Sequence, residues 1–174
     1  MQFLNQKLDD EIKELNKLLK PPKELGGKFL PEGLEKRFDF MFVAEMPSMN
    51  EPGKISANFN FNLTARDKFF QEMMVKYGVG GNYVTDIVKE RSKPRRPTEK
   101  EIKKWLKFLL KEVKIINPKA IIVLGKRTYE QSFRPYVEPN IPGAIKVDYV
   151  FHYSSRVPKK KFEDRFREVV GKVR

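Results

Sequence analysis

The chain has 174 residues, no cysteine and one histidine, which excludes disulfide bonds, cysteine-held iron–sulfur clusters and multi-histidine metal sites. No apolar run approaches the roughly 20 residues of a membrane-spanning helix, and the first residues lack the apolar core of a signal peptide. We therefore expect a cytoplasmic protein that has no membrane partner, and its formal net charge of +13 favours an anionic one.

The charge is distributed unevenly along the chain. Residues 1–87 carry 12 basic and 13 acidic side chains, whereas residues 88–174 carry 24 basic and 10 acidic side chains. Such an asymmetry favours a surface that meets a polyanion, and nucleic acid is the commonest candidate. A generic solvated surface is the alternative.

In chain order, helices and strands are predicted to alternate. Residues 1–37 are expected to form a helix, with apolar residues at helical spacing over 3–19, and a loop that packs on the rest of the domain. A buried strand is predicted for 38–46. Thr64 should cap a helix that extends to about residue 77, and a second strand should follow over 83–88.

The second half begins with a capping box formed by Thr98 and Glu101. The apolar stripe of the helix that it opens comprises Ile102, Trp105, Leu106, Leu109, Leu110, Val113 and Ile116. A third strand is predicted for 120–124, with a helix from about residue 127 and a fourth strand over 145–151. Pro158 is expected in the first turn of a final helix that extends towards residue 173.

Strands that alternate with helices predict one domain, residues 1–174, with a three-layer α/β/α fold and a four-stranded, mainly parallel sheet. In such sheets, ligands bind beyond the carboxyl ends of the strands. We therefore expect residues 45–48, 86–91, 125–126 and 152–156 to share one edge.

Two of these segments carry candidate catalytic residues. Glu45 follows the first strand in VAEMPS (43–48), and His152 follows the last strand in FHYSSR (151–156). A glutamate at a strand end is more often solvated, and a lone histidine is more often structural. Because both are expected at the same edge of the sheet, a catalytic role is favoured more strongly for the pair than for either residue by itself.

These segments resemble motifs of the uracil-DNA glycosylase superfamily. VAEMPS is similar to the Gly-Glu-Ala-Pro-Gly motif of one branch, and FHYSSR resembles the His-Pro-Ser motif. YVTDIVK (83–89) is similar to the central strand, which ends in a base-reading Asn. The stretch 89–97, the helix after it and NPKAIIVLG (117–125) match in order and spacing, so the resemblance covers roughly residues 38–165.

The resemblance implies a DNA glycosylase of base excision repair that releases uracil or another deaminated base with water and without a metal or cofactor. Glu45 would serve the sugar and the water, and His152 would hydrogen-bond the uracil carbonyl oxygen. The flipped base would stack on Phe61 or Phe59, for which a core position is the alternative. A monomer is expected, and a lyase step through a nearby lysine stays open.

The sequence departs from the family pattern in three respects. Met46 stands in the base-binding region where many members have Asp or Asn, so the catalytic carboxylate rests on Glu45. The branch with the similar motif usually carries an iron–sulfur cluster, which this chain cannot bind. Asp86 replaces the base-reading Asn. A neutral Asp86 would mimic Asn, an ionised one would select a base with an exocyclic amine, and a turn-capping Asp is the third possibility.

Two basic segments are expected to bind phosphate. KERSKPRR (89–96) has five basic residues and one acidic residue, and Lys159-Lys160-Lys161 opposes the helix dipole at the start of the last helix. Arg156 and Val157 occupy the place of the family's wedge residue. The expected DNA-contacting residues are Ser48, Lys89, Arg91, Arg95, Arg96, Lys126, Ser154, Arg156, Val157, Lys159 and Lys160. By contrast, a solvated face is expected for Lys103, Lys107, Lys111 and Lys114.

Two other functions stay open. A nucleic-acid-binding protein that keeps the fold without activity is consistent with Met46 and Asp86. A small nucleotide-binding α/β protein is the other, and the absence of a glycine-rich phosphate loop after the first strand disfavours it.

Overall fold

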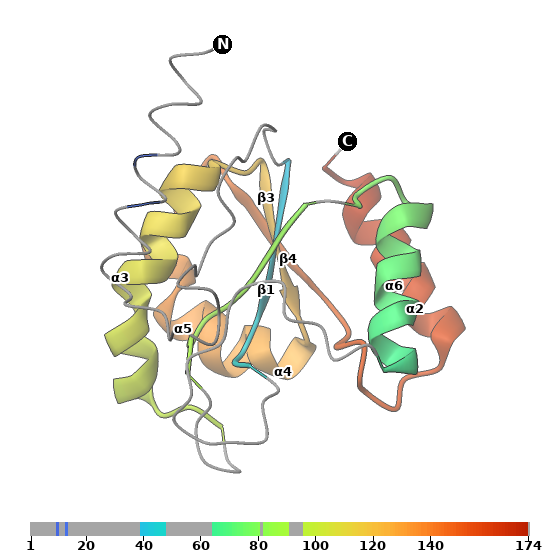
Figure 1. The fold of residues 1–174 in the computed structure, drawn as a ribbon, viewed down its shortest axis with the longest axis horizontal. Coiled ribbons are helices and arrows are strands. Elements are labelled where there is room, and N and C mark those ends of the chain that lie inside the picture. The colour runs from blue at the N-terminus through green and yellow to red at the C-terminus, as the bar shows by residue number, and fades with distance from the viewer. Residues whose placement is uncertain are drawn as a thin grey trace.

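The computed structural model describes Asp10, Lys13 and residues 39–47, 64–80, 82–90 and 96–173. These residues form three layers, with a central sheet between two layers of helices (Figure 1), which confirms the predicted fold class. The predictions for residues 1–37 fall almost entirely outside the described residues. None of the helices among the described residues combines the length and the apolar composition of a membrane span.

The sheet has four strands in the order β2-β1-β3-β4, and every neighbouring pair is parallel. The strands are β1 (Phe40–Ala44), β2 (Tyr83–Asp86), β3 (Ala120–Leu124) and β4 (Lys146–Val150). All four were predicted, the third with its observed bounds and the others two to four residues too long. Because the strands are parallel, their carboxyl ends lie at one edge.

Helices cover both faces of the sheet (Figure 1). One face is covered by α2 (Ala65–Lys76) and α6 (Lys159–Gly171). The other face is covered by α3 (Glu99–Ile116) and by a continuous helical run over residues 126–136. This run comprises α4 (Lys126–Thr128), the π-helix η2 (Tyr129–Phe133) and α5 (Arg134–Tyr136), and the 3-10 helix η3 (Glu138–Asn140) follows it.

Two predicted helix starts, at Thr64 and Thr98, are confirmed by reciprocal capping bonds. Thr64 accepts from the amide of Asp67 at 3.2 Å, and the Asp67 carboxylate accepts from the amide of Thr64 at 2.9 Å. Thr98 and Glu101 form the same pair at the start of α3. Each capping box satisfies two backbone donors that the first helical turn leaves unpaired. Pro158 is the residue that precedes α6, not a member of its first turn.

Two apolar layers hold the sheet between the helices. Phe42 and Phe70 lie on the side of α2 and α6, with ring centroids 5.8 Å apart. Trp105 and Leu109 of α3 pack with Phe133 on the other side. The lysines expected on the solvated face of α3, namely Lys103, Lys107, Lys111 and Lys114, are exposed as predicted.

Candidate active site

The segments that follow the strands lie together at the carboxyl edge of the sheet, as predicted. Ala44 pairs with Asp86 at the ends of β1 and β2. Beyond the strands, the amide of Val88 donates to the carbonyl oxygen of Glu45 at 3.1 Å. On the other side, the amide of Gly125 donates to the carbonyl oxygen of Val150 at 2.8 Å. These bonds bring the segments that carry Glu45, Asp86 and His152 to one edge.

His152 is held by the turn that follows it. The backbone amide of Ser154 donates to Nδ1 of His152 at 3.2 Å, and the Ser154 hydroxyl lies 2.7 Å from the same atom. A backbone amide can only donate, so Nδ1 is an acceptor and the proton of the neutral ring lies on Nε2. Burial lowers the pKa of His152, against the opposing charges of Glu45 and Asp67, and thereby favours this neutral form.

An aromatic stack supports the histidine ring. Tyr153 stacks on His152 with centroids 4.5 Å apart and on the fully buried Phe70 at 5.0 Å. Burial, with the nearby charges of Asp67 and Asp86, raises the pKa of Tyr153, so its hydroxyl stays protonated. Tyr153 stands where the related motif has Pro, and the motif by itself does not predict its role. The stack restricts rotation of the His152 ring.

Gly125 lies against the histidine from the adjacent strand. Its φ of +111° belongs to a region that L side chains rarely adopt. A Cβ atom at this position would stand 3.2 Å from Oγ1 of Thr128 and 3.4 Å from Cβ of His152. Any other residue at position 125 would therefore strain the backbone and press on Thr128 and His152.

Glu45 is bound on one of its two carboxylate oxygens. Oε1 accepts from the Ser132 hydroxyl at 2.7 Å, from Nε of Arg96 at 3.0 Å and from Nη2 of Arg96. Among the described residues, Oε2 has no hydrogen-bond partner. The Glu45 side chain keeps 17% of its surface exposed. The carboxylate is thus fixed in orientation through one oxygen, while the other has no partner in the described part of the chain.

Arg96 was expected to contact DNA phosphate, but its guanidinium is engaged within the protein. It joins Glu45 to the π-helix η2, because Nη1 also donates to Oε1 of Gln131 at 2.5 Å and Nη2 donates to Ser132 at 3.2 Å. Sequence reasoning missed Gln131 and Ser132. Their positions depend on the wider turn of the π-helix, and no local sequence motif predicts that turn.

Asp86, the residue in the place of the base-reading Asn, lies partly buried at the end of β2. Burial raises the pKa of Asp86 to about 7, with Lys89 acting to lower it and Glu112 to raise it. A substantial fraction of this carboxyl group is therefore neutral at neutral pH. In that form it can both donate and accept, as an Asn side chain does.

The prediction that Lys89 contacts phosphate is wrong. The Lys89 side chain has no exposed surface, and its ammonium donates to Oε2 of Glu112 at 2.6 Å, to the carbonyl oxygen of Asp86 at 2.6 Å and to Thr85. Glu112 is equally buried and also accepts from Thr85 and from Tyr83. A lysine in a basic run is buried here because α3 supplies a carboxylate beneath the sheet edge.

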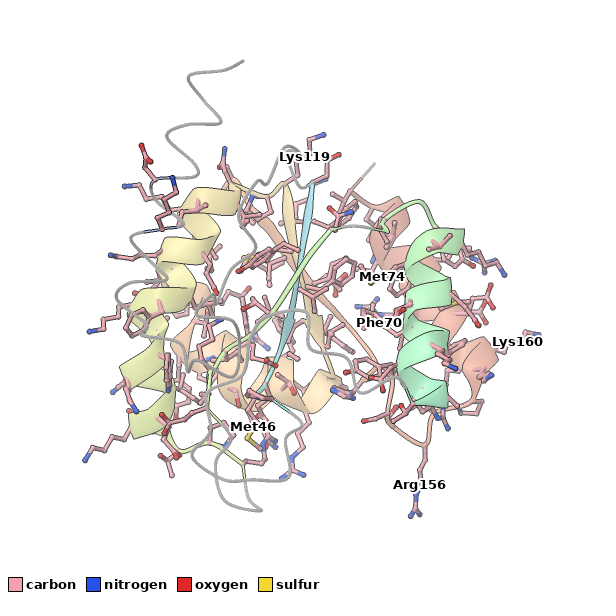
Figure 2. The ribbon with its side chains drawn as sticks, viewed as in Figure 1. Met46, Phe70, Met74, Lys119, Arg156 and Lys160 are labelled. Carbon is pink, nitrogen blue, oxygen red and sulfur yellow. The ribbon has the colours of Figure 1, made fainter. Side chains whose placement is uncertain are left out.

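The other described residues of the expected DNA surface do not all lie at this edge, because Lys160 projects from the side of the molecule (Figure 2). Met46 and Arg156 lie at the same end of the molecule and Lys119 at the opposite end, with the Arg156 side chain extending away from the protein (Figure 2). Met46 is partly buried and packs against the core on the α3 side. Ser154, Arg156, Lys126, Lys159 and Lys160 are exposed, and Val157 is partly buried.

Five predicted site residues lie outside the described part of the chain. They are Ser48, Phe59, Phe61, Arg91 and Arg95. The candidate platform for the base and part of the basic loop therefore stay predictions. No group of three or more His, Asp and Glu side chains that could hold a metal ion occurs among the residues that the structure describes.

A search of curated proteins found no match. The family model described as the Uracil DNA glycosylase superfamily matches residues 31–174. This match includes every strand of the sheet and every residue placed at its carboxyl edge. The chain therefore belongs to the uracil-DNA glycosylase superfamily.

Proposed function

We propose that the protein is a DNA glycosylase that hydrolyses the N-glycosidic bond of uracil or another deaminated base in DNA. The observation that carries the proposal is the arrangement of His152, whose Nδ1 accepts from Ser154 and whose Nε2 therefore bears the proton. A neutral imidazole with a fixed N–H is suited to donate to a carbonyl oxygen of the leaving base.

In the proposed reaction the bond between C1′ and the base nitrogen breaks, and its electron pair leaves with the base. His152 donates a hydrogen bond to the base carbonyl oxygen, where negative charge develops. Water then adds to C1′ of the oxocarbenium-like sugar, and Glu45 orients that water and accepts its proton. Water thereby supplies the nucleophile, and the step needs no metal or cofactor.

The base would be read by Asp86. In its neutral form Asp86 donates to one polar atom of the base and accepts from another, as Asn would with uracil. In its ionised form it only accepts, which suits an exocyclic amine. The pKa of about 7 makes both forms available near neutral pH. We propose that the neutral form reads uracil or a similar carbonyl-bearing base.

DNA would approach the carboxyl edge of the sheet. The exposed cations Lys126, Arg156, Lys159 and Lys160 would contact phosphates, and Val157 would enter the base stack. A role of Phe59 or Phe61 as the stacking platform belongs to the same proposal. A protein of this kind would act in base excision repair, as a monomer.

The test is base release from defined oligonucleotides that contain uracil, hypoxanthine, xanthine or mismatched cytosine, in single and double strands. Strand scission at the resulting abasic site is the readout. Release of any of these bases supports the proposal, and the preferred base identifies what Asp86 reads. No release of any base, with DNA still bound in a salt-sensitive way, would contradict it and favour a nucleic-acid-binding protein without activity.

A further inference from the structure

Arg96 and Ser132 form a clamp on Glu45, and the proposed reaction as described so far gives this clamp no role. Three donors, namely Nε and Nη2 of Arg96 and Oγ of Ser132, converge on the same oxygen, Oε1 of Glu45. A carboxylate oxygen has two lone pairs, so Oε1 has no acceptor capacity left for a water molecule. The second oxygen, Oε2, has no partner among the described residues.

The clamp is itself fixed by the π-helix. Nη1 of Arg96 donates to Gln131 at 2.5 Å, and Nη2 lies 3.4 Å from the carbonyl oxygen of Arg127. The side chain of Arg96 is 25% exposed, so most of it is withdrawn from solvent. Its planar guanidinium thus bridges the carboxylate and the helix, an arrangement that a lysine cannot reproduce.

We propose that Arg96, with Ser132, is a positioning residue that occupies Oε1 of Glu45 and thereby directs the attacking water to Oε2. This inference rests on the proposed glycosylase function. It has an electrostatic consequence, because the positive charge of Arg96 offsets the negative charge of Glu45. Glu45 then contributes mainly by orienting water and accepting its proton, and contributes little to direct stabilisation of the cationic sugar.

The alternative is that Arg96 contacts DNA phosphate and rests on Glu45 only in the absence of DNA. The two roles differ in what the loss of Arg96 changes. A positioning residue lowers the rate constant of bound substrate and leaves affinity unchanged. Loss of a phosphate contact lowers affinity. It also reduces the salt slope, which is the slope of the logarithm of the binding constant against the logarithm of the salt concentration, by about one.

The experiment uses single-turnover base release at saturating enzyme, with the oligonucleotide base that wild type releases best. Binding to an oligonucleotide that carries a tetrahydrofuran abasic analogue is measured alongside at several salt concentrations. The variants are Arg96→Ala, Arg96→Lys and Ser132→Ala. The matched control is Arg134→Ala, which removes an exposed arginine side chain of α5 that is no part of the clamp.

We expect Arg96→Ala to lower the saturating rate constant by about 10-fold to 100-fold, with affinity and salt slope unchanged. Arg96→Lys should fall between wild type and Arg96→Ala because one donor can return to Oε1. Ser132→Ala should lower the same rate constant by a smaller factor. It tests the inference in the case that Arg96→Ala does not fold. Arg134→Ala should retain the wild-type rate.

A wild-type saturating rate in Arg96→Ala, or a weakened and less salt-dependent affinity as its only change, would overturn the inference and leave base release itself intact. An inactive wild type would overturn both the inference and the proposed function, since no water attack would exist to direct. A structure with bound oligonucleotide gives an independent test. Arg96 on Oε1 of Glu45 supports the inference, and Arg96 on a phosphate overturns it.

Discussion

The backbone amide of Ser154 donates to Nδ1 of His152, two residues before it in the chain. This one bond fixes the tautomer of the ring, and the stack of Tyr153 on both His152 and Phe70 limits its rotation. The proton of the neutral ring is therefore on Nε2 before any substrate binds. An N–H donor that is oriented in advance incurs little reorganisation cost when charge develops on the leaving base.

Asp86 should make uracil release dependent on pH. Its pKa of about 7 lies above the ordinary carboxyl value of 3.8, so the neutral form predominates below pH 7 and is lost as the pH rises through 7. Release of uracil should fall over that interval if the neutral form reads the base. Asp86→Asn should remove this decline. A pH profile of the single-turnover rate is the measurement.

The same pKa sets the sign of a stability effect. The folded state holds the Asp86 proton more tightly than the unfolded chain, so this group's contribution to the free energy of unfolding decreases as the pH rises from about 4 to about 7. Asp86→Asn should flatten that part of the curve of unfolding free energy against pH.

The same variant also tests the activity profile. An Asp86→Asn protein whose uracil release still declines above pH 7 would show that another group causes the decline.

Gly125→Ala should affect both folding and catalysis. The φ of +111° strains any L residue, and the added Cβ would press on Thr128 and His152. We expect a loss of about 1–3 kcal/mol in the free energy of unfolding and a lower rate of base release. Urea denaturation and single-turnover kinetics measure these effects.

The matched control is Gly143→Ala, because a Cβ at residue 143 meets no atom within 4 Å. It should change the free energy of unfolding by less than about 0.5 kcal/mol. Equal effects of the two substitutions would contradict the assigned role of Gly125.

Lys89→Met should strongly destabilise the fold. It leaves the fully buried carboxylate of Glu112 without its cation, which typically costs about 3–5 kcal/mol. The double variant Lys89→Met/Glu112→Leu should recover much of that loss, since it removes both charges. Lys104→Met is the control, because the exposed pair of Lys104 with Glu90 should contribute at most about 1 kcal/mol. A Lys89→Met protein as stable as wild type would contradict the buried pair.

Arg156→Ala should weaken DNA binding at all sequences and reduce the salt slope by about one. Arg156 extends from the end of the molecule that carries the candidate site, whereas Lys119 lies at the opposite end (Figure 2). Lys119→Ala is therefore the control and should leave affinity unchanged. Fluorescence anisotropy at several salt concentrations separates the two. Equal losses would indicate a diffuse charge effect instead of a binding edge.

The sequence predicted the features that depend on neighbouring residues. The capping box of Thr98 and Glu101 and the strand ends at Glu45 and His152 follow from local spacing, and the structure agrees. Parallel strands then require a common edge. The resemblance located the same residues independently and predicted the family that the comparison shows.

Features that depend on distant residues were missed. Lys89 lies in a basic run, and only Glu112, 23 residues further along the chain, explains its burial. The contact of Arg96 with Glu45 joins residues that are 51 positions apart. The pKa of Asp86 depends on burial and on both members of the Lys89–Glu112 pair. Such couplings are set by packing, which a local pattern does not encode.

The catalytic roles of Glu45 and His152 are tested most directly by single-turnover base release from wild type, Glu45→Gln and His152→Ala. Affinity for the abasic analogue is measured in parallel. We expect release by wild type and a loss of about 10²-fold or more in each variant, with DNA affinity retained. Release that neither variant slows would contradict the assignment of Glu45 and His152 as catalytic residues.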